Sequence, residues 1–309
     1  MVDYTELISK MTDEEKASLC SGADFWHTKG VARLGIPQMM LTDGPHGLRK
    51  QIGKNDHLGL NAAYPATCFP TASAAANSWD EAMIEQMGRR LGAETRTQRV
   101  GVILGPGVNI KRSPLCGRNF EYYSEDPLLT GFMASAAVRG IQSAGVSACP
   151  KHFACNNQET NRIYNDSRLS ERALREIYLK GFEICVKTAH PQNIMTSYNK
   201  INGVWGHYNY ELCEMILRRE WGYEGNIMTD WWMRSSKSPE FPKMRDQAYR
   251  VRSGVNVLMP GGSRGSKRKP DGTLLKTYKK NDGITLGELQ RNAEWVLRFI
   301  VNSQAMNRL

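Results

Sequence analysis

Short apolar runs that end on a polar residue or a glycine recur along the whole chain, and this repetition most restricts the fold. Six runs follow the pattern, at residues 39–44, 100–107, 146–152, 193–198, 225–232 and 255–261. A run of this length between turn residues is typical of a buried strand. Residues 66–70 are a candidate for a further strand.

Helical patterns lie between these runs. After Ser170, a candidate N-cap, apolar residues recur at helical spacing while charged residues occupy the other face. Residues 211–221 follow the same pattern, and Gly222 is placed to end that helix. Strands that alternate with helices imply right-handed βαβ units, and about seven such units favour an α/β fold of the (β/α)8 TIM barrel type over an open sheet.

Polar side chains gather where the predicted strands end. Asp43, Lys151, His152, Tyr198 and Asp230 all occupy such positions. In a barrel the carboxyl ends of the strands form the face that carries the chemistry. An acid at a strand end beside two indoles, as at 230–232, is typical of sites that bind and cleave sugars. The alternative is that Asp230 only caps the next helix and that the tryptophans belong to the core.

Length and composition predict one domain without a cofactor. The 309 residues are 40% apolar, which is enough for one large core, and no convincing linker divides the chain. The N-terminus resembles no signal peptide and no run is long enough to span a bilayer, so a cytoplasmic protein is expected. Several of the seven cysteines lie in apolar contexts, which favours reduced core thiols. We expect no metal, since no His/Cys cluster has ligand spacing, and no phosphate cofactor, since 105–107 lacks a nucleotide-loop pattern.

The net charge of +10 raises the question of nucleic-acid binding. Much of the charge lies between Arg264 and Lys280, but within that stretch only Tyr278 could stack on a base. A solvated basic segment, or one that docks against an acidic partner domain, is the better interpretation.

Five motifs in register carry a resemblance to a known family. They are residues 42–49 (TDGPHGLR), 117–127 (GRNFEYYSEDP), 151–162 (KHFACNNQETNR), 197–203 (SYNKING) and 229–231 (TDW). Together they resemble glycoside hydrolase family 3, in its β-glucosidase branch, over nearly the whole chain and in the family's order. The resemblance also implies a barrel that is irregular near the N-terminus, with a missing or reversed strand, which fits the weak strand signals before Pro70.

The resemblance implies a role for each motif residue. Asp230 is expected to be the nucleophile of a retaining glycosidase, kept ionised by nearby cations such as Lys151 and Arg162 that lower its pKa. Asp43 is expected to accept hydrogen bonds from distal sugar hydroxyls. The remaining substrate-binding residues implied are donors, apolar walls and a supporting arginine: Arg118, Lys151, His152, Trp231, Tyr198, Met195 and Arg49. Three structural alternatives remain: Arg118 pairs with Glu121 or Glu125, His152 is a satisfied strand-end residue, and Arg49 supports the site without contacting a ligand.

A retaining glycosidase needs a second carboxyl group about 5 to 5.5 Å from the nucleophile. In the family's β-glucosidases it comes from a second, α/β sandwich domain, which is expected to be absent from residues 1–309, after a last helix near 286–300. The single-domain branch uses a loop His and Asp after a Lys-His-Phe-Pro-Gly motif, but here Ala154 follows Phe153. Glu125, Glu159 and Asp166 are the nearest in-chain carboxyls, and a structural role is favoured for each.

The sequence thus predicts the barrel of a retaining, β-glucosidase-like hydrolase that removes terminal non-reducing β-D-glucosyl residues. The acid/base glutamate is expected from a second domain or polypeptide. The alternatives are a non-catalytic carbohydrate-binding barrel, a β-xylosidase of the same family, and, least favoured, a scaffold that merely retains the motif residues.

Overall fold

The six apolar runs form six short buried strands. A computed structural model describes residues 3–53, 61–261 and 272–303. The strands are β1 (Leu41–Thr42), β2 (Val102–Ile103), β3 (Ser147–Ala148), β5 (Asn193–Met195), β8 (Asn226–Trp231) and β9 (Val257–Met259). They pair in parallel as β1-β2-β3 and as β5-β8-β9. The predicted strand at 66–70 is wrong, because this segment lies between Pro65 and Pro70, which lack an N–H, and is largely exposed.

Single bridges join the two sheets into a barrel. A parallel bridge between Phe153 and Thr196 links the β3 side to β5. On the other side, Ser21 bridges Leu258 of β9 in parallel, and His27 bridges Met40 in an antiparallel sense just before β1. The segment 21–28 therefore occupies the place where a further parallel strand is expected. This is the predicted irregularity near the N-terminus, and the (β/α) barrel itself is confirmed.

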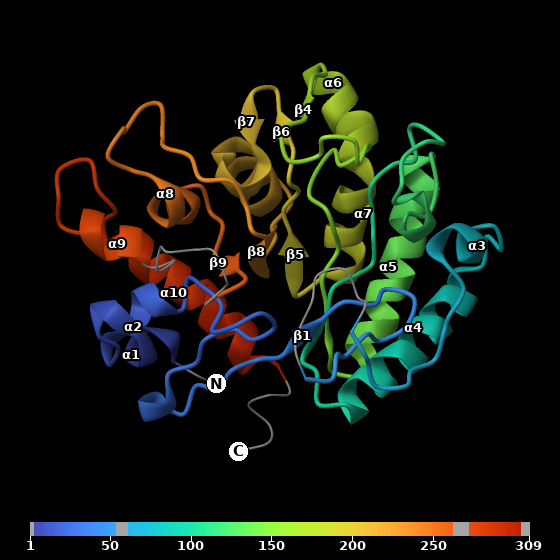
Figure 1. The fold of residues 1–309 in the computed structure, drawn as a ribbon, viewed down its shortest axis with the longest axis horizontal. Coiled ribbons are helices and arrows are strands. Elements are labelled where there is room, and N and C mark those ends of the chain that lie inside the picture. Colours follow the sequence, from blue (N-terminus) through green and yellow to red (C-terminus); the bar gives the residue numbers. More distant parts are fainter. Residues whose placement is uncertain (1–2, 54–60, 262–271, 304–309) are drawn as a thin grey trace.

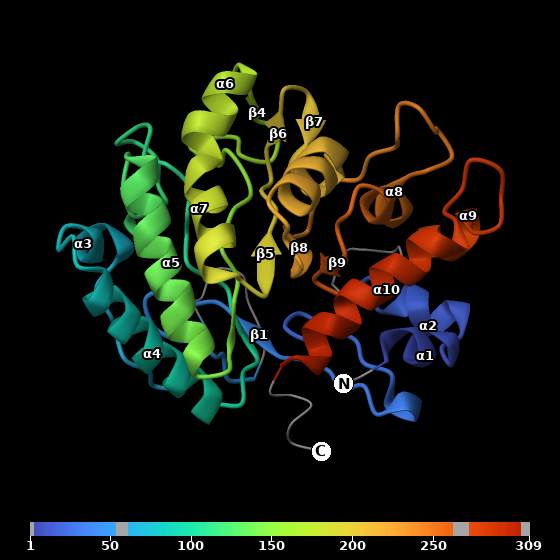
Figure 2. The ribbon, with the colours of Figure 1, turned by 180° about the vertical axis from the view of Figure 1, so that it is seen from behind.

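Helices surround the strands (Figures 1 and 2). Those between successive barrel strands and after the last one are α3 (Ala72–Ala76), α4 (Glu81–Thr97), α5 (Pro127–Ser143), α6 (Glu171–Ala173), η3 (Leu174–Tyr178), α7 (Lys180–Ala189), η5 (Glu211–Glu220), α8 (Asp246–Arg252), α9 (Gly272–Thr277) and α10 (Leu286–Val301). The chain begins with α1 (Tyr4–Ser9) and α2 (Asp13–Ser18), which pack on α10. Short 3₁₀ turns are η1 (Ala32–Leu34), η2 (Asn119–Glu121) and η4 (Gly206–Tyr208), and a small sheet outside the barrel holds β4 (Asp166–Ser167), β6 (Lys200–Ile201) and β7 (Val204–Trp205).

The predicted helix limits follow from capping. The Ser170 hydroxyl accepts a hydrogen bond from the backbone N–H of Ala173 and so begins the helical stretch α6–η3–α7. Gly222 has a φ of 71°, a left-handed conformation that favours glycine and ends η5. In α10, Thr285 and Glu288 form a reciprocal capping box.

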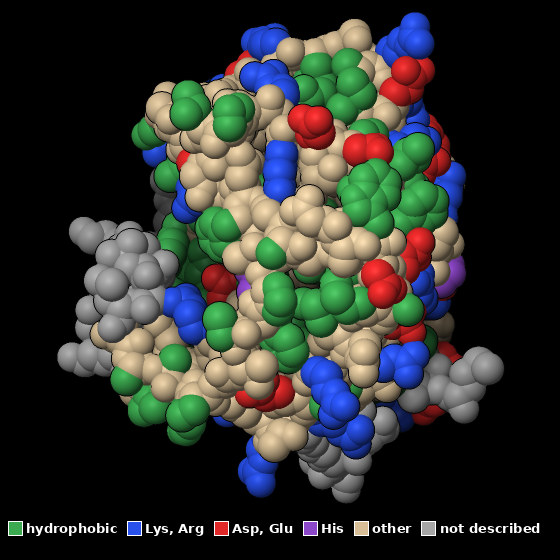
Figure 3. All heavy atoms as spheres, turned by 90° about the vertical axis from the view of Figure 1, so that its right-hand side faces the viewer, with side chains coloured by type: hydrophobic (Ala, Val, Ile, Leu, Met, Phe, Trp, Pro, Cys, Tyr) green, Lys and Arg blue, Asp and Glu red, His purple; other side chains and the backbone are tan. Residues whose placement is uncertain are grey.

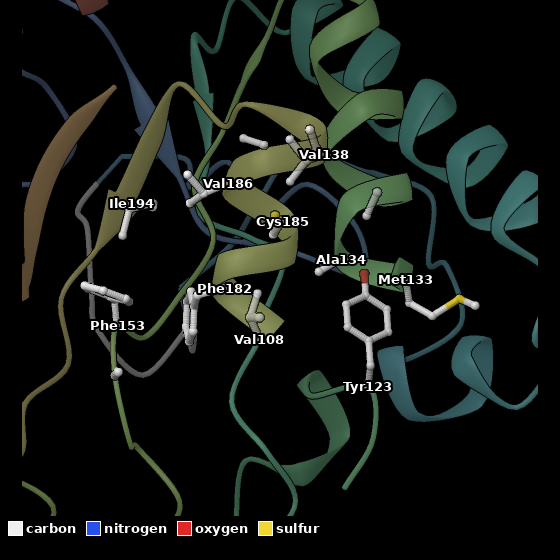
Figure 4. Packing of buried hydrophobic residues seen from close by; sticks show 14 of the residues in the cluster. Val108, Tyr123, Met133, Ala134, Val138, Phe153, Phe182, Cys185, Val186 and Ile194 are labelled. Atoms are coloured by element: carbon white, nitrogen blue, oxygen red, sulfur yellow. The ribbon is translucent and has the colours of Figure 1, made fainter. Parts of the chain in front are cut away.

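The core fills the space between the strands and the outer helices (Figure 4). Phe182 and Val186 of α7 face Phe153 and Ile194 of the barrel, and Val138 lies on α5 beyond them. The contact between α4 and α5 is close enough to require glycine. A Cβ added at Gly140 would lie 2.2 Å from the carbonyl oxygen of Glu85.

The surface mixes apolar and charged side chains on the α3–α5 side (Figure 3). Exposed apolar residues of this region include Trp79, Leu128 and Phe132.

None of the helices in the described part of the chain is long and apolar enough to cross a membrane. Of the basic stretch 264–280, residues up to 271 lie outside the described residues, and Lys279 approaches Asp13 at 3.7 Å.

Candidate active site

A cavity of about 430 Å³ opens at the carboxyl ends of the strands. All ten residues singled out in the sequence line it: Asp43, Arg49, Arg118, Lys151, His152, Arg162, Met195, Tyr198, Asp230 and Trp231. Asp43 follows β1, Lys151 follows β3, and Asp230 lies within β8, so the carboxyl ends of three strands of the same barrel bring them to one place. Trp232, the second indole beside Asp230, also lines the cavity, as do Phe25, Trp26, Leu104 and Ile163, which were not predicted.

Asp230 is buried with 8% of its surface exposed. Its Oδ1 accepts the backbone N–H of Trp231 at 2.7 Å. The helix that follows, α8, begins at Asp246 with Arg245 as its N-cap, so the alternative in which Asp230 caps that helix is wrong. Its Oδ2 lies 3.7 Å from Nε2 of His152.

The predicted effect of the cations on Asp230 is wrong in its net direction. Burial raises the pKa of this carboxyl, and this outweighs Arg118, the largest opposing charge, together with Arg162 and Lys151. The reason is that the side chain is largely removed from water, which disfavours the charged form. The two predicted cations do lower the pKa, but Arg118 does so more strongly than either.

One wall of the cavity is a cluster of charged side chains, to which Asp43, Arg118 and Lys151 belong. Lys151 Nζ donates to Oδ1 of Asp43 at 3.0 Å and lies 3.4 Å from Oε2 of Glu121, and Arg118 Nε donates to Oε1 of Glu121. Burial raises the pKa of Asp43 and of Glu121. The nearby charges of Lys151 and Arg118 lower each pKa by more than burial raises it, so both net shifts are downward. Both carboxyl groups are therefore held ionised.

Glu121 was considered in the sequence only as a structural partner of Arg118. That pairing is present, and so is a role in the cluster, because Glu121 also faces Lys151 from behind the cavity wall with 3% of its surface exposed. Its position three residues after Arg118, across the short η2 turn, was the available signal.

His152 is a neutral hydrogen-bonding group. Burial, followed by the charges of Arg118 and Lys151, holds the pKa of His152 well below its usual value. Its Nδ1 lies 3.0 Å from the hydroxyl of Tyr122. The alternative that His152 is merely a satisfied strand-end residue accounts for Nδ1 only, since Nε2 faces the cavity side and Asp230.

Aromatic side chains form the other walls. The Tyr198 hydroxyl donates to the carbonyl oxygen of Trp231 at 2.7 Å, and Trp231 Nε1 donates to the carbonyl oxygen of Phe25 at 2.9 Å. The guanidinium of Arg162 lies 4.5 Å from the ring centre of Tyr198. Trp231 is thus fixed at both ends and presents a rigid apolar surface, of the kind that packs against a sugar ring.

Comparison with known proteins identifies the family. The model of the glycosyl hydrolase family 3 N terminal domain matches residues 11–298. The chain belongs to this family. The thermostable β-glucosidase B of Acetivibrio thermocellus is 46% identical over 97% of this chain and 38% of its own length. An exo-α-(1→6)-L-arabinopyranosidase of Bifidobacterium longum is 44% identical over 96% of this chain and 37% of its own.

Solved structures of family 3 agree with the fold. The β-glucosidase 3B of Thermotoga neapolitana in complex with glycerol superposes with a TM-score of 0.88 at 38% identity, over 99% of this chain and 43% of that chain. The same enzyme in complex with glucose gives a TM-score of 0.86. The TIM-type barrel is therefore that of family 3. The chain spans about two fifths of the length of the relatives that it matches.

The three other carboxyls near the family 3 motifs do not line the cavity. Asp166 pairs with Arg168 at 2.7 Å and accepts the backbone N–H of Gly203, and Glu159 pairs with Arg162 at 2.9 Å. Glu125 is exposed. Among the residues that the structure describes, only Asp43 and Asp230 supply carboxyls to the cavity, and no group of His, Cys, Asp and Glu is arranged to hold a metal ion.

Proposed function

We propose that this chain carries the sugar-binding, nucleophile-bearing part of a retaining β-glucosidase-like hydrolase. The observation that carries the proposal is the placement of buried Asp230 in one cavity with Asp43, Arg118 and Lys151 of the charge cluster, with Trp231 as a wall. A pyranose bears hydroxyls around its edge and apolar faces. A cavity with ionised groups on one wall and an indole on another complements both features.

The residues divide the first chemical step among them. The backbone N–H of Trp231 holds Oδ1 of Asp230, which leaves Oδ2 to attack the anomeric carbon. The bond from that carbon to the leaving oxygen breaks as the bond to Oδ2 forms, which gives a covalent glycosyl-enzyme. Water then cleaves this ester, and the two inversions retain the anomeric configuration. Asp230 attacks in its ionised form, so activity should fall as the pH is lowered and the carboxyl becomes protonated. Because burial raises the pKa of Asp230, this fall should begin at a higher pH than for an ordinary aspartate.

The leaving oxygen requires a proton, and in the second step water requires a base. Asp43, the other cavity carboxyl of the described residues, is held ionised by Lys151 and serves as an acceptor rather than an acid. We therefore place the acid/base in a second domain or polypeptide. Residues 1–309 form the barrel unit of that assembly, and the basic segment 264–280 is a candidate docking surface.

Asp43 and its neighbours set the choice of sugar. A carboxylate accepts hydrogen bonds from two adjacent hydroxyls, and Arg118, Lys151 and His152 donate to others. A terminal β-D-glucosyl residue fits this set. A pentopyranoside, as in a β-xyloside, is the second candidate, because a relative at 44% identity is named an arabinopyranosidase.

Covalent labelling tests the proposal. A 2,4-dinitrophenyl 2-deoxy-2-fluoro-β-glucoside needs no acid to depart, so it should label Asp230 in the 309-residue chain, as read by peptide mass spectrometry. Asp230→Ala should not be labelled, whereas Asp166→Asn, which changes a carboxyl held by Arg168, should be labelled like the wild type. A label on another carboxyl refutes the assignment. Glucose binding without any label favours the non-catalytic carbohydrate-binding alternative.

A further inference from the structure

A row of hydrogen-bonded side chains runs behind the cavity from Arg162 to His152. Arg162 Nη1 donates to Oε2 of Glu159 at 2.9 Å, and Oε1 of the same carboxylate accepts from Asn156 Nδ2 at 3.0 Å. Asn156 Nδ2 also donates to the Tyr122 hydroxyl oxygen at 3.0 Å, and that hydroxyl meets His152 Nδ1 at 3.0 Å. Asn156, Tyr122 and His152 are each at most 1% exposed, so water does not compete for these contacts.

The direction of each contact in the row can be assigned from the groups that have a hydrogen to donate. The Glu159 carboxylate, paired with Arg162, has no hydrogen to give, so it fixes the Asn156 amide with its nitrogen toward Glu159. The second N–H of that amide occupies a lone pair of the Tyr122 oxygen. Burial raises the pKa of Tyr122 well above its usual value, so the hydroxyl keeps its single hydrogen. His152 Nδ1 is the other atom in contact with this hydroxyl, at 3.0 Å, and we assign it as the acceptor of that hydrogen.

The tautomer of His152 follows from this direction. A neutral imidazole that accepts at Nδ1 carries its hydrogen on Nε2. Nε2 lies 3.7 Å from Oδ2 of Asp230, which is too long for a hydrogen bond, so its N–H is available to a ligand hydroxyl. The opposite tautomer would turn a lone pair toward the Asp230 carboxyl and remove a donor from the cavity.

We propose that Tyr122, oriented through Asn156 by Glu159, is a positioning residue that fixes His152 as an Nε2–H donor to a sugar hydroxyl. The part that concerns sugar rests on the proposed function. The part that concerns the tautomer stands on the hydrogen-bond row alone. Neither Tyr122 nor Asn156 lines the cavity, so both act on a ligand only through His152.

Two variants separate the possible directions of the row. Asn156→Asp puts a second carboxyl beside Glu159, and the two must share one proton in the contact between them. The carboxyl oxygen at position 156 then accepts from Tyr122, so the Tyr122 hydrogen should turn toward it and His152 should become the Nδ1–H tautomer. Tyr122→Phe adds no charge and removes the bias, so both tautomers should be populated. Tyr123→Phe is the matched control, because Tyr123 is the adjacent buried tyrosine and its ring packs in the core beside α5 (Figure 4).

Long-range ¹H–¹⁵N correlation of histidine-labelled protein reads the tautomer directly, with His152→Gln used for assignment. We expect Nε2–H in the wild type and in Tyr123→Phe, and a change in the other two variants. Titration calorimetry with glucose should show affinity about threefold to tenfold weaker in Tyr122→Phe, as for one lost hydrogen bond, and unchanged in Tyr123→Phe.

An Nδ1–H tautomer in the wild type, or an Nε2–H tautomer kept in both Asn156→Asp and Tyr122→Phe, overturns the proposal. If the wild type has the expected tautomer but does not bind glucose, the proposed function fails while the role of Tyr122 in fixing His152 stands. Equal glucose affinity in the wild type and in Tyr122→Phe, with the tautomer altered, refutes the role toward sugar.

Discussion

Removal of the Glu121 charge should destabilise the fold. The cluster holds two cations, Arg118 and Lys151, and two carboxylates, Asp43 and Glu121, so Glu121→Gln leaves one positive charge in excess. Loss of one partner of a buried pair costs about 3 to 5 kcal/mol. The lower end applies here, because a glutamine oxygen still accepts from Arg118 and because the Asp43 side chain, 40% exposed to the cavity, keeps part of the cluster hydrated. We expect the free energy of unfolding to fall by about 3 kcal/mol.

The pH dependence gives this prediction a sign. Burial raises the pKa of Glu121, but the charges of Lys151 and Arg118 lower it by more than burial raises it. The folded-state pKa therefore lies below the unfolded one. Such a group stabilises the fold above its unfolded pKa, near about 4.3, and this stability is lost as the pH falls through the folded pKa. The difference between the wild type and Glu121→Gln should therefore be constant from about pH 6 to 8 and shrink below about pH 4.

Urea unfolding followed by tryptophan fluorescence measures both effects. Glu125→Gln is the matched control, because Glu125 is exposed four residues further along, and it should change stability by less than about 0.5 kcal/mol. Equal stability of Glu121→Gln and the wild type at pH 7, or a difference that grows as the pH falls to 4, would refute the reasoning.

Three further predictions concern the site and the core. Asp43→Ala should reduce activity or affinity toward glucosides far more than toward xylosides, which lack the primary hydroxyl, and equal losses would show that Asp43 is structural. The isolated 309-residue chain should release 2,4-dinitrophenolate from its β-glucoside in a burst followed by a very slow phase, with little turnover of the 4-nitrophenyl substrate. Rapid 4-nitrophenyl turnover that Asp230→Ala abolishes would instead place an acid within this sequence. Gly140→Ala should lower the unfolding free energy by about 1 to 3 kcal/mol because its Cβ meets the Glu85 carbonyl, whereas Gly287→Ala in α10, where nothing lies within 4 Å, should raise it by up to about 1 kcal/mol, as measured by urea unfolding.

The barrel strands and the strand-end residues were accessible from the sequence because both depend on local signals. Buried parallel strands are nearly continuous apolar runs, and the residue that ends each run reaches the same rim. Asp43 and Lys151, which are 108 residues apart, could therefore be expected to meet. Residues 66–70 were mistaken for a strand because an apolar run flanked by prolines has the same composition whether or not it finds a partner.

Other features depend on long-range burial, which no local pattern shows. The pKa of Asp230 is set by the loss of water around it, and a sequence shows its cations more readily than its desolvation. Tyr122 became significant only once its hydroxyl was seen between Asn156 and His152. Phe25 reaches the cavity because segment 21–28 bridges both β9 and the residue before β1, a closure that the runs alone do not specify.

The contact between Phe25 and Trp231 has a consequence for biosynthesis. The carbonyl that accepts from the Trp231 indole belongs to a residue translated 206 positions earlier. At about 5 to 20 residues per second, Phe25 is synthesised on the order of 10 to 40 seconds before its partner Trp231. During that interval Phe25 and Trp26 lack the Trp231 side chain that they contact in the folded protein. Nascent chains stalled before β8 should therefore present these two rings to chaperones, and this wall of the cavity can form only after β8 has been synthesised.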